Sequence, residues 1–157
     1  MVDYSQSLID ACRYGMAMSS LPSSDQDKEL IRNALLVSYQ EVFQALLERV
    51  KRLVVLDDAG NARFMVPRER LTDTEKIGLQ LIARKFAKTI DLTPTETMSA
   101  DELSRIIGKP AKTISARIAG MRREGWIDAD ERGAYRIRYT AIEELVNKIE
   151  ARAGGSP

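Results

Sequence analysis

The segment KTISARIAGMRREGWI, residues 112–127, lies in the most basic part of the sequence, and no Asp or Glu occurs from residue 103 to residue 123. A second basic stretch follows, in which no acidic residue comes between Arg132 and Glu143. Gathered Lys and Arg side chains attract polyanions even where the net charge, here +1, is small. The basic side chains concerned are Arg105, Lys109, Lys112, Arg117, Arg122, Arg123, Arg132, Arg136 and Arg138.

Other chemistry is mostly excluded by composition. The chain has no histidine, and Cys12 is its one cysteine. This removes disulfides, Cys/His zinc sites, Cys-His and Ser-His nucleophile pairs and imidazole acid-base catalysis. Carboxylate chemistry and Asp/Glu magnesium sites remain open, and Asp57 and Asp58 are the one local acidic pair. We interpret that pair as a turn, because Gly60 and Asn61 follow it between apolar runs. We therefore expect no enzyme, no metal and no cofactor.

The first half of the chain is expected to hold one long helix. Residues 25–52 contain neither Gly nor Pro, and apolar residues recur there at steps of three or four. At ~1.5 Å per residue this helix is about 40 Å long, more than a small domain needs, so part of its apolar face is expected to meet a second copy in a homodimer. Residues 53–67 then predict a hairpin that is too small to stand alone and should pack on something. Met16 and Met18 fit a helix packed on the long one.

Helix starts are marked in the second half by Thr or Ser placed three residues before Glu, the pattern of reciprocal N-terminal capping. Thr72, Ser99 and Thr140 each begin such a pattern. The second helix is closed by Gly108, and the third is the segment described first, with Ile114, Ile118 and Met121 at helical spacing. A second hairpin with a turn at residues 130–133 precedes the last helix. The fold class predicted is mainly α with small β-hairpins.

The order helix, helix, helix, hairpin, helix, with the short break GKPA, resembles the winged helix-turn-helix superfamily of transcription regulators. The resemblance is most specific over residues 99–139 and extends loosely over 72–152; residues 1–71 resemble no family that we recognise. The residues that carry it are Leu103, Gly108, Thr113, Ile114, Ser115, Ile118, Met121, Gly125 and Ile127. It implies double-stranded DNA as the partner, bound through helix 110–124 and a wing at 127–138. The same superfamily also supplies protein-binding modules.

By position, the resemblance implies roles for several residues of the third helix and for one residue of the wing. Thr113 and Ser115 become phosphate donors, Lys112, Arg117 and Arg123 contact the groove or the backbone, and Arg132 lies at the tip of the wing. Lys109, Arg122 and Arg136 join this DNA-binding set by their place in the basic stretches. The alternative is that Thr113 merely caps the helix and the cations are solvated surface. Trp126 either closes the core or forms an exposed anchor.

The sequence departs from the family where bases are read, since Ala116, Ala119 and Gly120 leave the middle of the outward face almost bare. Small residues let the helix backbone approach DNA closely, with recognition through phosphates and DNA shape. Alternatively the bare strip docks a protein partner, and the chain is a winged-helix scaffold subunit.

The domain organisation expected has three parts: residues 1–67 as a dimerisation segment, 68–152 as the DNA-binding domain and 153–157 as a disordered tail. No apolar run approaches the ~18 residues of a membrane span, and residues 1–20 lack the pattern of a secretory signal. We accordingly expect a cytoplasmic protein.

Overall fold

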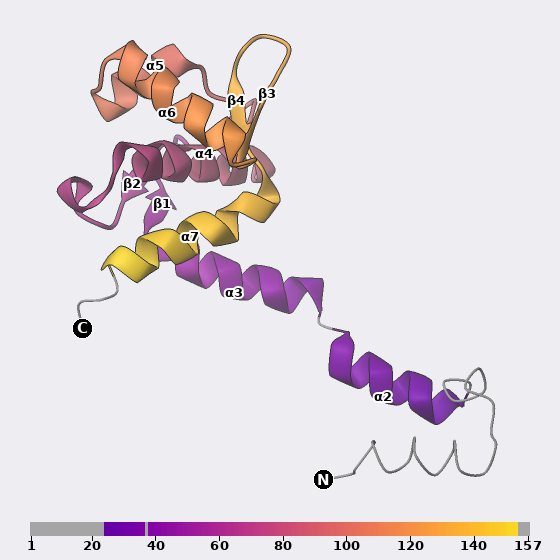
Figure 1. Ribbon diagram of the computed structural model, residues 1–157. Helices are drawn as coiled ribbons and strands as arrows, with labels where there is room; N and C mark the ends of the chain where they lie inside the picture. The colour runs from indigo at the N-terminus through magenta and orange to yellow at the C-terminus, as the bar shows by residue number, and fades with distance from the viewer. Residues whose placement is uncertain (1–23, 37, 154–157) are drawn as a thin grey trace. The chain divides into compact units, whose positions relative to one another are not determined.

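The computed structural model describes residues 24–36 and 38–153 of the chain. Cys12, the helix expected around Met16 and Met18, and residues 154–157 of the expected tail lie outside these ranges. The described chain is mainly helical with two small antiparallel hairpins, as predicted (Figure 1). It divides into two units, residues 1–42 and 43–157. Its elements are α2 (Asp25–Leu35), α3 (Tyr39–Lys51), β1 (Val54–Leu56), β2 (Ala62–Phe64), η2 (Arg68–Arg70), α4 (Asp73–Thr89), α5 (Ala100–Ile107), α6 (Ala111–Arg123), β3 (Ile127–Ala129), β4 (Tyr135–Ile137) and α7 (Tyr139–Ala153).

The single long helix expected over residues 25–52 is wrong, because the chain forms two helices there. Helix α2 ends at Leu35, and Leu36 has extended backbone angles (φ −81°, ψ 105°). Helix α3 starts again at Tyr39, and the Val42 N–H donates to the Ser38 carbonyl at 3.1 Å. Helix α2 buries none of its residues, so no packed apolar face holds a continuous helix through the break. The helix length of ~40 Å inferred from the sequence is therefore wrong as well.

Helix α4 is the centre of the second unit. Its start is held by the predicted capping box, in which Thr72 Oγ1 accepts from the Glu75 N–H and Glu75 accepts from the Thr72 N–H, each at 3.1 Å. The helix contacts β1 and β2 as well as α5, α6, β4 and α7, and Figure 1 shows it running between the α5–α6 pair and α7. Because neighbours cover it on several sides, its apolar residues are buried around much of its circumference: Ile77, Leu79, Leu81 and Ile82 are all 0% exposed.

The β1–β2 hairpin packs on α4, which confirms that it needs a support. Its turn contains the acidic pair, and Asp57 Oδ1 accepts from the N–H groups of Ala59 and Asn61, both at 2.9 Å, so the interpretation of this pair as a turn is confirmed. Val50, Leu53 and Val54 belong to the same hydrophobic core as the helices that follow. The second unit starts at Phe43, so it includes this hairpin, which was expected to belong to the N-terminal segment.

Helices α5 and α6 form the predicted helix-turn-helix. Ser99 caps α5 by accepting from the Glu102 N–H at 3.1 Å, and Gly108 ends the helix in the left-handed region at φ 80°. Glycine suits that backbone conformation because it has no Cβ. Helix α6 follows Pro110 and contacts both α4 and α5.

The cap predicted at Thr140 is wrong, because α7 already begins at Tyr139 and Thr140 lies in its first turn. Strand β4 ends at Ile137, so only Arg138 separates strand from helix, and its carbonyl accepts from the Ala141 N–H at 3.0 Å. At the other end of α7, Arg152 pairs with Glu75, which is 2% exposed, and donates to the Arg70 carbonyl at 2.9 Å. These bonds join the end of α7 to the start of α4.

Helices α4 and α7 approach each other closely at Gly78. A Cβ built on Gly78 overlaps the side chain of Leu145, which is 0% exposed. Gly120 in α6 is different, since the nearest atom that its Cβ would meet is Arg123 Nη2 at 3.8 Å.

We predict opposite stability effects for alanine at these two helical glycines. Gly78→Ala gains ~1 kcal/mol of helix propensity but overpacks the core by about 1–3 kcal/mol, so it should lower the free energy of unfolding. Gly120→Ala should raise it by up to ~1 kcal/mol. Urea denaturation of both variants and the parent measures the difference. A Gly78→Ala variant as stable as Gly120→Ala would contradict the close α4–α7 contact.

Candidate nucleic-acid interface

Helix α6 has one buried stripe and one exposed basic face. Ile114, Ile118 and Met121 are at most 2% exposed and anchor the helix in the core. The cations of α6 lie outside this stripe and are all exposed, and none of them forms a salt bridge with a described residue. They are Lys112, Arg117, Arg122 and Arg123. An exposed cation without a carboxylate partner keeps its charge available to an external anion.

The N-terminus of α6 is also positive. The cap residue Pro110 makes no side-chain cap hydrogen bond, and the first turn contains no acidic residue, whereas α5 has Asp101 and Glu102 in its first turn. Free first-turn N–H groups and the helix dipole favour an anion at such an end. Thr113 is the third residue of α6 and half-buried, so it is not the cap residue; Ser115 is exposed.

The small residues of α6 border a shallow groove of about 300 Å³ that extends to α4 and α7. Ala116 and Ala119 are exposed and Gly120 is half-buried. The groove is lined by Ala116 and Gly120 together with several charged and polar side chains, which are Thr74, Arg117, Arg123, Glu124 and Lys148. Three cations against one carboxylate give this groove a positive character. Lys148 comes from α7, and no local motif in the sequence marks it for this place.

Trp126 closes the core beside this groove and is not an exposed anchor. The side chain is 8% exposed, and its Nε1–H donates to Glu144 Oε2 at 2.8 Å. Lys148 Nζ lies 5.2 Å from the centre of the indole ring, within the range of a cation–π contact. The indole thus connects the core to the cationic wall of the groove.

The β3–β4 hairpin, which we call the wing, lies next to α6 through contacts of α6 with β3. Its predicted turn is present, with Asp130 Oδ1 accepting from the N–H groups of Arg132 and Ala134 at 2.9 Å. Arg132 is exposed in this turn, but Glu131 is exposed beside it. Arg136 is exposed on β4, with its Nε 3.9 Å from a Glu96 oxygen.

Arg138 belongs to the basic stretch in the sequence but is engaged within the wing. Its guanidinium donates twice to Asp128 Oδ1, at 2.6 and 2.9 Å. These hydrogen bonds, and then the charges of Arg138, Arg136 and Arg122, hold the pKa of Asp128 below its ordinary value. On the same strand Tyr135 is half-buried and Ile137 is buried, whereas Tyr139 is 39% exposed because it begins α7.

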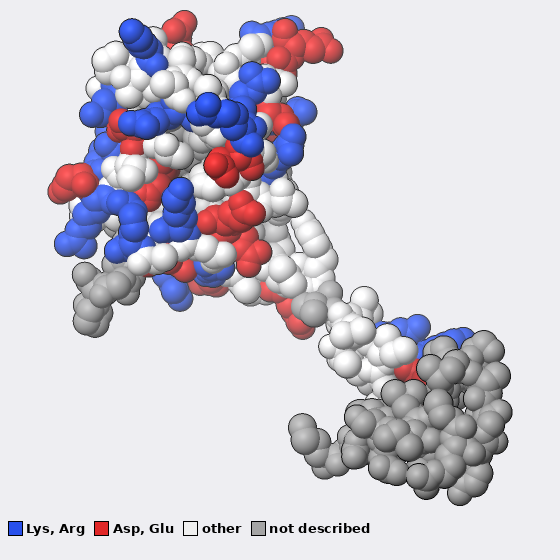
Figure 2. Space-filling model, in the orientation of Figure 1, with Lys and Arg blue, Asp and Glu red and all other residues white. Residues whose placement is uncertain are grey.

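The structure thus brings the predicted residues of α6 and the wing onto adjacent elements, and Lys109 is exposed in the turn between α5 and α6. Figure 2 shows blue side chains over the region where Figure 1 draws α6 and the wing, with red ones among them. Within the described ranges, no group of Cys, Asp and Glu side chains is placed to hold a metal ion, and no helix is both long and apolar enough to cross a membrane.

Comparison with known proteins gives one informative similarity. Over 53 residues, 34% of this chain, the sequence is 49% identical to the HTH-type transcriptional regulator YgaV of Escherichia coli (strain K12). The matched region is 52% of that protein, so the chain spans about half the length of this relative. No protein-family model matches the chain, and no solved structure gives a significant match. The similarity supports a helix-turn-helix in this chain, in agreement with α5 and α6.

Proposed function

We propose that the protein is a cytoplasmic transcription regulator that binds duplex DNA through residues 110–124 of the helix-turn-helix and the wing at 127–138. The observation that carries this proposal is the exposed face of α6, whose cations have no salt-bridge partner among the described residues and lie beside a second exposed element. The similarity to a helix-turn-helix transcriptional regulator supports the same assignment. The winged-helix geometry supplies the docking mode, with α6 in the major groove.

In this mode most of the binding free energy comes from phosphates. Lys112, Arg117 and Arg123 contact the DNA backbone or groove edges, and the N-terminus of α6 with the Thr113 and Ser115 hydroxyls binds a phosphate. Guanidinium groups can also bind guanine in a bidentate manner. The bare strip formed by the small residues Ala116, Ala119 and Gly120 lets the helix approach the floor of the DNA groove. Specificity then depends more on DNA shape than on a long list of base contacts.

The bare strip is tested by Ala116→Glu, which puts a carboxylate where the helix must approach DNA. Ala116 is exposed and outside the buried stripe, so the fold should persist while affinity for duplex DNA falls by roughly 100-fold or more. Ala151→Glu, at an exposed position of α7 outside the groove and outside residues 25–66, is the control with the same change of charge and should bind as the parent does. Gel-shift titrations measure both.

The same variant separates the two functions left open by the sequence. A winged-helix scaffold would use the strip to dock a protein partner. If Ala116→Glu binds DNA as well as the parent, the strip is not a DNA surface, and the proposal fails at this point in favour of the scaffold.

The turn of the wing contains two exposed residues of opposite charge, Glu131 and Arg132. Arg132→Gln should weaken DNA binding on all sequences, because it removes a phosphate contact, and Glu131→Gln should strengthen it, because it removes a repulsive carboxylate. Both side chains are exposed, so neither change should alter the melting temperature by more than a degree or two. Fluorescence anisotropy with a labelled duplex measures the affinities. Effects of the same sign for the two variants would rule out wing-phosphate contact.

The homodimer is part of the proposal, with residues 25–66 as its interface. In the described chain, exposed large apolar side chains gather in α2 and its flank: Leu30, Ile31, Leu35 and Leu36 are 49–75% exposed. Such a face is typical of an interface between chains. Because α2 and α3 are separate helices, the interface is not a single long coiled coil, and the spacing of two DNA-binding helices does not follow from a helix length.

Light scattering on the full chain at micromolar concentration should therefore give the mass of a dimer. Leu35→Lys should shift it to the monomer, because a charge in a buried apolar interface costs several kcal/mol. Leu92→Lys, at a position 38% exposed outside the interface, is the control and should leave the dimer intact. A monomeric parent would disprove the dimer while leaving DNA binding by a single chain to be measured separately.

A further inference from the structure

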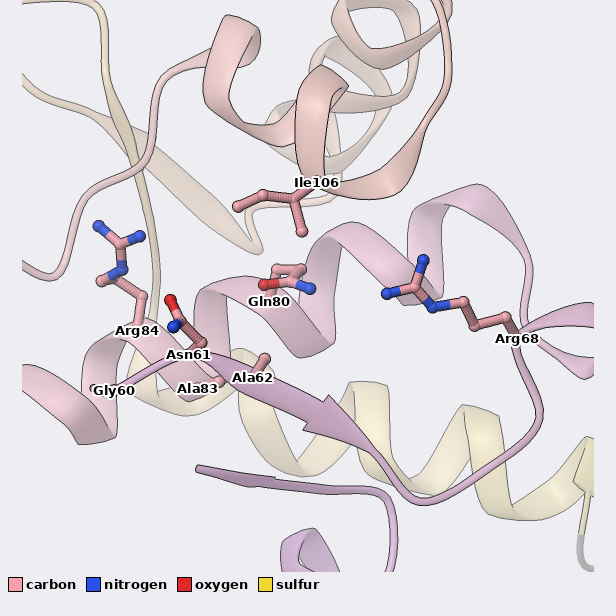
Figure 3. Close-up of a pocket in the computed structure, with 8 residues that line it drawn as sticks. All are labelled: Gly60, Asn61, Ala62, Arg68, Gln80, Ala83, Arg84 and Ile106. Carbon is pink, nitrogen blue, oxygen red and sulfur yellow. The ribbon is translucent and has the colours of Figure 1, made fainter. Parts of the chain in front are cut away.

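A small polar pocket lies between the β1–β2 hairpin, α4 and α5, and shares no lining residue with the groove beside α6 (Figure 3). Its volume is about 170 Å³. Asn61 and Arg68 line it from the hairpin and the segment that follows, Gln80 and Arg84 from α4, and Ile106 from α5. In Figure 3 the Gln80 side chain lies between α4 and Ile106, with Arg68 and Arg84 on opposite sides of it.

Gln80 is the unusual residue of this pocket. It is 5% exposed, yet its side-chain amide makes no hydrogen bond with any described residue. In the described chain, every side-chain nitrogen or oxygen that is fully enclosed has a hydrogen-bond partner. The Gln80 amide has none, so it is not fully enclosed and borders the pocket. The amide N–H and carbonyl groups of Gln80 are therefore available to hydrogen-bond a solute in the pocket.

The charge around Gln80 favours an anion. No Asp or Glu lines the pocket. Arg84 is already engaged, with Nη2 2.5 Å from Glu102 Oε1. Arg68 is exposed and forms no salt bridge with a described residue; its guanidinium stacks 5.4 Å from the centre of the Phe64 ring. It therefore presents free N–H donors in the planar geometry that suits a carboxylate or a phosphate.

We propose that this pocket binds a small metabolite that carries a carboxylate or phosphate group. Arg68 holds the oxyanion, and Gln80 exchanges hydrogen bonds with a hydroxyl or amide group next to it. The volume is below the ~300–1,000 Å³ of sites for drug-sized ligands, which restricts the ligand to a few heavy atoms. Ile106 and Ala83 supply apolar walls for its carbon atoms. This site goes beyond the proposed function, and through Ile106 its occupant contacts the first helix of the helix-turn-helix.

The binding test uses the full chain without DNA, so its result does not depend on whether the chain binds DNA. Glycolate and inorganic phosphate are titrated separately while the side-chain amide signals are followed by ¹H–¹⁵N NMR. At least one of them should shift the Gln80 amide signal saturably, and the two titrations distinguish a carboxylate from a phosphate ligand. Glycolamide, the neutral counterpart of glycolate, should leave the signal in place. No saturable shift with either anion up to about 50 mM would overturn the proposal.

Two variants locate the binding. Arg68→Gln changes an exposed side chain, so the chain should stay folded while affinity for the anion falls at least tenfold; Arg63→Gln, an exposed arginine of β2 outside the pocket, is its matched control and should bind as the parent does. Gln80→Met, of similar shape, should leave the chain folded, because it replaces an amide that makes no hydrogen bond with a described residue, and should weaken anion binding at least tenfold. Unchanged binding in Arg68→Gln would overturn the proposal whatever Gln80→Met does.

Discussion

The burial of α4 on several sides is the constraint on which the rest of the second unit depends. A surface helix needs only one apolar stripe, but α4 has fully buried side chains at four of the six positions from Ile77 to Ile82, together with the glycine that allows α7 to approach. Each neighbour covers a different part of it, so the hairpin, α5, α6 and α7 are all placed relative to one helix. The Thr72–Glu75 cap and the Glu75–Arg152 pair hold the junction between the start of α4 and the end of α7.

This arrangement determines what α6 presents to solvent. The stripe of Ile114, Ile118 and Met121 packs in the core that surrounds α4. Because this stripe faces inward, the cations and small residues on the rest of α6 face outward. Arg138 shows the contrast: it lies in the same basic sequence but is paired with Asp128 and adds little free charge. A cation that is paired in the fold and one that is not look alike in the sequence. The proposal for DNA therefore rests on the unpaired members, not on the number of Lys and Arg residues.

Local signals in the sequence predicted much of this unit correctly. Thr72 and Ser99 mark helix starts, Gly108 marks a helix end, and the spacing of Ile114, Ile118 and Met121 identifies the buried stripe, because each depends on a few neighbouring residues. Thr140 has the same local pattern but fails, since the strand before it runs almost directly into α7. The break after Leu35 has neither Gly nor Pro to mark it. The Lys148 side of the groove and the unpartnered Gln80 arise from contacts between distant segments, which no local pattern contains.

The most direct measurement is the salt dependence of binding between the full chain and a labelled DNA duplex. Each phosphate neutralised by Lys or Arg releases counterions and lowers log K by ~0.9 for a tenfold increase in salt. Because Lys112, Arg117, Arg122 and Arg123 are all free to contact phosphates, we predict measurable affinity at low salt and a slope steeper than about −2.5, equivalent to roughly three phosphates. No binding at about 50 mM salt, or an affinity independent of salt, would contradict the assignment of α6 and the wing as a DNA-binding surface.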